Sequence, residues 1–210
     1  MRTTADNFWE FPDAPLRGRG RILLVLLTIP LLLSFAFPLW QIYMKAPQYP
    51  SGLTMDIYSY QVVGGNDGHD VQEINTLNHY IGMHTITREE LRDLDWIPFA
   101  IVGMALLSWR AALLGNVRAL IDLSMIAGYV SVVAFGRFVW MLYEFGHHLD
   151  PKAPVKVAPF MPVVIGEKQI ANFHTVSMPQ LGSVLMGTFT MGVFGLTLAF
   201  SRFSTAAAAR

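Results

Sequence analysis

The sequence predicts an all-α membrane protein with four transmembrane helices and a small extracytoplasmic cap that contains a short strand or hairpin. The chain of 210 residues is 53% hydrophobic and only 14% charged, whereas a soluble domain carries about 25% charged residues. Each of four apolar stretches is long enough for a hydrocarbon core of about 30 Å. They divide a single membrane domain into spans at approximately 22–44, 96–114, 120–145 and 181–200.

The first span runs from Ile22 to Met44 and contains Pro30. Membrane helices tolerate an internal proline better than soluble helices do. A cleaved signal peptide is the alternative, but its apolar region has roughly 7–15 residues and ends at a small-x-small site. The stretch here is longer and has no clear site of that kind, so we expect a retained anchor.

Arginines orient the four spans. The short link between the second and third spans carries Arg110 and Arg118. The chain ends carry Arg2, Arg17, Arg19, Arg21, Arg202 and Arg210. We expect the protein in a bacterial inner membrane. Because cytoplasmic loops are enriched in positive charge, both termini are expected on the cytoplasmic side of that membrane. The two long loops, 45–95 and 146–180, are then outside.

The first outer loop has a pattern of its own. Residues 53–63 alternate between apolar and polar side chains, which predicts a strand, and the glycine-rich residues 64–68 predict a turn. Residues 71–82 have helical character, and a capping box at 87–90 predicts the start of a helix leading into the second span. The second outer loop contains five prolines and is expected to be extended.

All six histidines fall in these outer loops, and two of them open the same pattern, His79-x-x-x-Met83 and His174-x-x-x-Met178. Imidazole and thioether together suit copper, and thioether favours Cu(I). The chain has no cysteine, which excludes iron–sulfur clusters and c-type haem. The predicted copper ligands are His79, Met83, His84, His147, His174 and Met178. The alternative is that these are surface histidines beside packing methionines.

Polar neighbours of these residues are expected to support the site or the fold. Glu144 or Asp150 would fix the tautomer of a liganding histidine. Arg137 lies inside the third span and is expected to pair with Glu144, two helical turns away. The alternative is that its side chain extends outward to the membrane interface. Asn78 and Tyr80 complete the predicted supporting set.

Several function classes are disfavoured by what the sequence lacks. There is no H-E-x-x-H, Walker or G-x-S-x-G motif, so no enzyme is predicted. The net charge of zero argues against a nucleic-acid partner. The spans lack the paired acids and repeated broken helices of a transporter. The expected partners are the lipid bilayer and a periplasmic copper protein or subunits of a membrane complex.

Four strings of residues carry a family resemblance: 46–50 (APQYP) with Gly52-Leu53, 77–83 (LNHYIGM), 146–151 (GHxLDP, in which position 148 is not part of the pattern) and 170–173 (IANF). Together they resemble a family of small bacterial four-span membrane proteins associated with gene clusters for nitrous-oxide reductase and its maturation. The resemblance implies an accessory role in copper supply, maturation or electron delivery for that periplasmic copper enzyme. It draws attention to Asn78, His79, Tyr80, Met83, His147 and Asp150. His84, His148 and His174 fall outside the strings.

The leading hypothesis is therefore a non-enzymatic membrane accessory protein that binds copper or docks a periplasmic copper enzyme. The alternative is a structural or docking subunit of a respiratory membrane complex that binds no metal. A copper site requires the histidine and methionine side chains to converge on one point, whereas a structural role leaves them scattered or bonded to backbone.

Overall fold

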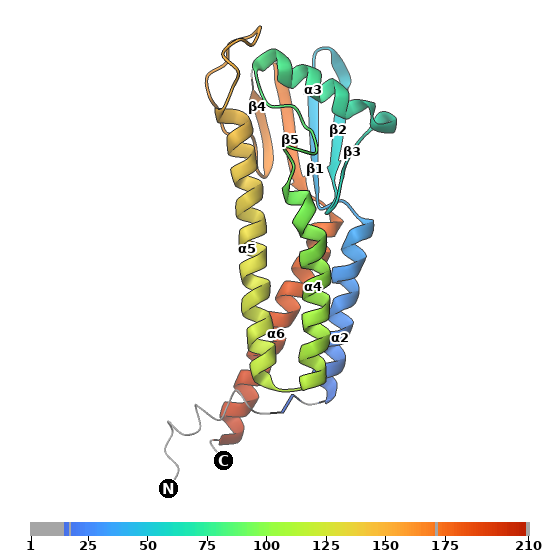
Figure 1. Cartoon of the computed structure of the whole chain (residues 1–210), viewed down its shortest axis with the longest axis vertical. Coiled ribbons are helices and arrows are strands. Elements are labelled where there is room, and N and C mark those ends of the chain that lie inside the picture. Colours follow the sequence, from blue (N-terminus) through green and yellow to red (C-terminus); the bar gives the residue numbers. More distant parts are fainter. Residues whose placement is uncertain (1–14, 17, 171, 209–210) are drawn as a thin grey trace. The chain divides into compact units, whose positions relative to one another are not determined.

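The computed structural model describes residues 15–16, 18–170 and 172–208. Arg2, Arg17 and Arg210, on which the predicted orientation partly depends, lie outside the described residues, as does Ala171 of the fourth string. The helices are α2 (Gly18–Leu33), α3 (His69–Ile81), α4 (Asp93–Leu114), α5 (Val117–His147) and α6 (Leu181–Ala208). The strands are β1 (Trp40–Ala46), β2 (Tyr49–Ile57), β3 (Val62–Gly64), β4 (Gly166–Ile170) and β5 (Phe173–Pro179) (Figure 1).

The chain divides into two compact units. The first, here called the helical unit, contains residues 1–33, 99–132 and 185–210. The second, here called the sheet unit, contains residues 34–98 and 133–184. Helices α4, α5 and α6 each contribute residues to both units.

Small and polar residues join the helices of the helical unit. The indole nitrogen of Trp109 donates to the hydroxyl of Thr28 at 3.2 Å. The hydroxyls of Ser124 and Thr197 lie 2.5 Å apart. Gly192 lies close to the Leu27 side chain, whose tip would have to shift to accommodate a Cβ at 2.4 Å. Close approach at small residues is typical of membrane helix packing.

Within the described residues, four helices are long and apolar enough to cross a membrane: Gly18–Ala36, Asp93–Leu114, Val117–His147 and Leu181–Phe200. The expectation of four apolar membrane-length helices is therefore confirmed. Large apolar side chains of the helical unit remain exposed, including Leu113 at 83% and Val132 at 73%. Such a surface is compatible with contact with lipid rather than water.

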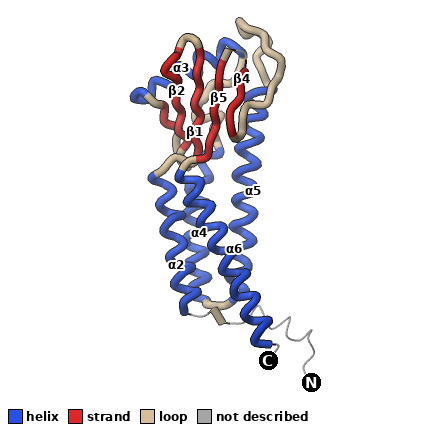
Figure 2. The backbone as a smooth tube through the Cα atoms, turned by 180° about the vertical axis from the view of Figure 1, so that it is seen from behind, coloured by secondary structure: helices blue, strands red, loops and turns tan. Residues whose placement is uncertain are grey.

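The sheet unit shows that the predicted fold class is correct only in part, because the protein is not purely all-α. It contains a five-stranded sheet in the order β3-β2-β1-β5-β4, with every neighbouring pair antiparallel. Figure 2 shows these strands as one continuous sheet. The sequence predicted only a short strand or hairpin. The central pair, β1 with β5, joins the segment after α2 to the segment before α6, and a pairing of such distant segments leaves no local signal.

The predicted first span, 22–44, covers most of a helix and the start of a strand. Helix α2 ends at Leu33, a 3-10 turn follows at Ser34–Ala36, and residues 40–46 form β1 instead of the end of a helix. Pro38 precedes the strand, and a proline disfavours helical backbone at the residue before it. Because the residues of the strand are also largely apolar, the sequence did not indicate the change from helix to strand.

The first outer loop was predicted more closely. The strand expected at 53–63 is divided into β2 and β3 by a turn in which the Tyr58 amide donates to the Gln61 carbonyl. The helix expected at 71–82 is α3, which packs Ile74 and Leu77 against Leu53 of the sheet. The capping box does not start α4, because residues 88–92 form turns and the helix begins at Asp93.

Candidate functional site

The two outer loops meet in the sheet unit. The Asp150 amide donates to the Gly82 carbonyl at 2.8 Å, and the Val155 amide donates to the Tyr80 carbonyl at 2.9 Å. Gly82 adopts φ +78°, and a Cβ there would lie 2.8 Å from the Asp150 oxygen. Two of the strings that carry the family resemblance, 77–83 and 146–151, therefore bind each other through backbone.

His79 and Met83 do not lie on one side of a helix. Helix α3 ends at Ile81, and the left-handed Gly82 turns the chain before Met83. His79 is exposed, whereas Met83 lines an internal cavity. A spacing of four residues would place both side chains on one side of a continuous helix, but α3 ends between His79 and Met83.

His174 and Met178 lie on the opposite face of the sheet from this cavity. Phe173 and Thr175 line the cavity, and successive side chains of a strand point to opposite faces, so His174 points away from it. Met178 shares the face of His174 but is four residues along the strand, about 13 Å at the usual rise. The His174 ring lies 3.3 Å from the Glu167 carboxylate. The two His-x-x-x-Met motifs are thus not brought together.

The remaining predicted ligands each have a local partner. His84 lies 3.4 Å from the Glu90 carboxylate. The Nδ1 atom of His147 is 3.0 Å from the Tyr143 carbonyl, and its ring stacks on that tyrosine at a centroid distance of 3.8 Å. Across the described ranges, no three His, Asp or Glu side chains are grouped as ligands for one ion. Copper binding stays a prediction.

The supporting residues have different partners from those expected. Arg137 pairs with Asp93 at 3.1 Å, not with Glu144. Glu144 lies seven residues from Arg137, about 10 Å along the helix, and contacts His148 at 2.7 Å. Asp150 accepts a hydrogen bond from the Lys152 amide at 2.8 Å. It therefore shapes a turn rather than orienting a histidine.

One polar residue in each of the strings 77–83 and 46–50 makes a hydrogen bond at α3. Asn78 is 4% exposed, and its side-chain amide donates to the His84 carbonyl at 3.3 Å. The Tyr49 hydroxyl donates to the Glu73 carboxylate. This hydrogen bond, with desolvation and the negative charge of Glu73, raises the pKa of Tyr49 above its ordinary value.

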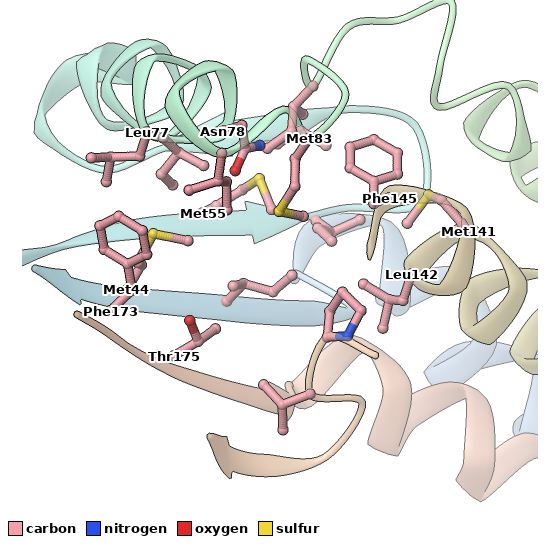
Figure 3. A pocket seen from close by; sticks show the side chains of 18 of the residues that line it. Met44, Met55, Leu77, Asn78, Met83, Met141, Leu142, Phe145, Phe173 and Thr175 are labelled. Atoms are coloured by element: carbon pink, nitrogen blue, oxygen red, sulfur yellow. The ribbon is translucent and has the colours of Figure 1, made fainter. Parts of the chain in front are cut away.

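An apolar cavity of about 90 Å³ lies between α3 and the sheet, and it was not predicted from the sequence. Its wall includes Met44 from β1, Met55 from β2, Leu77 from α3 and Phe145 from α5 (Figure 3). Asn78 and Thr175 are the two polar residues of the wall. The alternation of apolar residues in β1 and β2 could have indicated an interior sheet face, but nothing local indicated a void.

In the comparisons with known proteins, no family model, no curated protein and no solved structure matches this chain. The relation to the nitrous-oxide reductase gene clusters therefore remains a prediction from the four strings.

Proposed function

We propose that the protein is a non-enzymatic membrane accessory protein that docks a periplasmic copper enzyme, nitrous-oxide reductase, on its sheet unit. The enzyme is the partner that the family resemblance implies. The distribution of arginines supports an arrangement with the sheet unit on the periplasmic side of a bacterial inner membrane.

One observation supports docking most strongly, and it concerns the string 77–83. Leu77, Asn78 and Ile81 are between 4% and 6% exposed, so the packing of α3 accounts for them. Tyr80 is 51% exposed and His79 is also exposed, so packing within the chain does not account for these two residues. Tyrosine is enriched among the residues that dominate protein–protein binding. Contact with the surface of a partner protein would account for both exposed side chains.

Copper binding through His79 is a second candidate, and a specific observation favours it. Four of the other histidines contact Glu90, Tyr143, Glu144 or Glu167. Among the described hydrogen bonds and ion pairs, none involves the His79 ring. One imidazole leaves coordination positions of a copper ion open for ligands from the docked enzyme. Copper would then bridge the two proteins rather than occupy a closed site.

The docking proposal is tested with full-length protein in lipid nanodiscs and purified nitrous-oxide reductase. We expect Tyr80→Ala to weaken the measured affinity at least about tenfold, equivalent to about 1.4 kcal/mol. Gln72→Ala is the matched control, because Gln72 is exposed on the same helix but lies outside the strings. Absence of binding by the parent, or equal effects of the two variants, would contradict docking through this surface.

The copper candidate is tested in the same assay with Cu(I) present and absent. Bridging predicts that Cu(I) raises the affinity and that His79→Ala removes this gain while the copper-independent affinity remains. His69→Ala is the control, since His69 is an exposed histidine at the other end of α3. An affinity that does not respond to Cu(I) would exclude bridging and leave docking as the function.

A further inference from the structure

We propose that the cavity of the sheet unit binds the end of one neutral hydrocarbon chain, either an acyl chain of a phospholipid or the isoprenoid chain of a quinone. This proposal is independent of docking. The membrane-length helices of the same protein would keep it in a bilayer, where such chains are abundant.

The wall of the cavity fits an uncharged apolar ligand. All of its residues except Asn78 and Thr175 are apolar, and none is charged. A carboxylate, phosphate or metal ion inside would lack an opposite charge and would be strongly disfavoured. A charged headgroup must therefore stay outside, and only a neutral chain suits the interior. Apolar cavities of about 150 Å³ in other proteins remain dry and bind benzene, so a cavity of about 90 Å³ holds only the last few carbon atoms of a chain.

The shape of the cavity fits an elongated ligand. Figure 3 shows Met44 and Phe173 at one end of the lined space and Met141 and Leu142 at the other. The wall is contributed by strands, by α3, by α5 and by the segment around Phe160, so the space runs between elements instead of forming a pit within one. The end of a linear chain fits such a space.

The methionines of the wall argue against a simple packing defect. Met44, Met55, Met83 and Met141 all line the cavity. Methionine is unbranched and flexible and usually fills irregular gaps in a core. An empty space deprives the lining atoms of contacts and lowers stability. These four methionine side chains are flexible enough to fill the space, and yet it is open. The same flexibility would let them adapt to hydrocarbon chains of different saturation or branching.

The two polar residues of the wall, Asn78 and Thr175, are uncharged. The nitrogen of the Asn78 carboxamide is used by the His84 carbonyl, and the carboxamide faces the cavity (Figure 3). Thr175 is 7% exposed and lies on the sheet side of the same space. A hydrocarbon chain leaves both polar groups unused, so neither of them is needed to bind it.

The test uses photo-crosslinking of the full-length protein in phospholipid vesicles. One set of vesicles contains a phospholipid with a diazirine in its acyl chain, and a second contains a quinone with a diazirine in its isoprenoid chain. The proposal predicts crosslinks on the peptides that contain Met55, Met83 and Met141 in at least one set, and the labelled set identifies the source of the chain. Crosslinks confined to exposed helix positions such as Leu113 and Val132 in both sets would overturn it.

A cavity-filling variant gives a second measurement. Met83→Trp should reduce labelling of the peptide containing Met55 at least about tenfold without lowering Tm, because the indole occupies the space. Met178→Trp is the matched control, since Met178 is a methionine of the same unit on the other sheet face. Unchanged labelling in Met83→Trp would contradict the assignment. Should that variant fail to fold, Ile86→Phe at the half-buried edge of the wall is measured in its place.

Discussion

The amide nitrogen of Asp150 donates a hydrogen bond to the carbonyl oxygen of Gly82 at 2.8 Å. The bond joins the residue that follows the end of helix α3 to the segment that follows α5, 68 positions later in the chain. A Cβ on Gly82 would also lie 3.0 Å from the Cβ of Ala153. Both glycine and the left-handed backbone at position 82 are therefore needed for the two outer loops to meet.

Gly82→Ala should destabilise the protein strongly. The substitution places a Cβ on left-handed backbone, which costs about 1–3 kcal/mol by itself, and brings it 2.8 Å from the Asp150 oxygen. We expect a loss beyond that range in thermal unfolding. Gly68→Ala is the control, because Gly68 has φ +92° but a Cβ there would meet nothing within 4 Å. Equal losses in both variants would show that contact with Asp150 does not matter.

Ser177→Ala tests the buried polar network at the centre of the sheet. The Trp40 indole donates to the Ser177 hydroxyl at 2.7 Å, and that hydroxyl donates to the Val164 carbonyl at 2.8 Å. Removing the hydroxyl leaves a buried N–H without its acceptor, at a cost of about 1–3 kcal/mol.

The matched control for this prediction is Ser183→Ala. Ser183 donates to the Leu39 carbonyl, which also accepts the Gln180 amide, so this acceptor keeps a partner. Denaturant unfolding should show a clearly smaller loss for Ser183→Ala. A larger loss than for Ser177→Ala would argue against the importance of the Trp40 bond.

The ion pair of Arg137 and Asp93 should make a measurable but small contribution. The Arg137 side chain is 53% exposed and the Asp93 side chain is 19% exposed, so the pair is partly buried; exposed pairs are worth about 0.2–1 kcal/mol. A double-mutant cycle with Arg137→Met and Asp93→Asn should give coupling in this range. The same cycle with Glu144→Gln should give none, and coupling to Glu144 instead would restore the pairing predicted from the sequence.

Tyr49→Phe tests the pH dependence of the Tyr49–Glu73 hydrogen bond. The pKa of Tyr49 is raised in the folded state, chiefly because its hydroxyl donates to the Glu73 carboxylate. Its contribution to stability is therefore fully present below the ordinary tyrosine pKa of about 10 and is lost as pH rises through the folded value. The stability difference between parent and Tyr49→Phe should be constant from neutral pH to about pH 10 and fall above it. A difference independent of pH would contradict this.

The helices could be predicted from the sequence because their signals are local. Continuous apolar stretches define the four membrane-length helices, and the pattern at 71–82 differs from α3 by two residues at its start and one at its end. The turn after β3 was also predicted, because glycine and asparagine favour it. The error in the first span arose because Trp40 to Met44 are apolar enough to extend a helix.

The sheet and the candidate site could not be predicted because they depend on distant pairings. The register of β1 with β5 places Lys45 opposite His174, and that pairing decides which sheet face each residue occupies. Without it, His174 and Met178 could not be assigned to the face away from the cavity. Likewise, the partner of Arg137 lies on another helix, and the periodicity of α5 alone pointed to Glu144.

The most direct test of docking is hydrogen–deuterium exchange of the full-length protein in nanodiscs with and without purified nitrous-oxide reductase. The account predicts that the enzyme slows exchange in residues 77–83, around His79 and Tyr80, and leaves residues 173–178 of β5 unchanged. Protection confined to β5, or no protection anywhere in the sheet unit at saturating enzyme, would contradict docking through the end of α3.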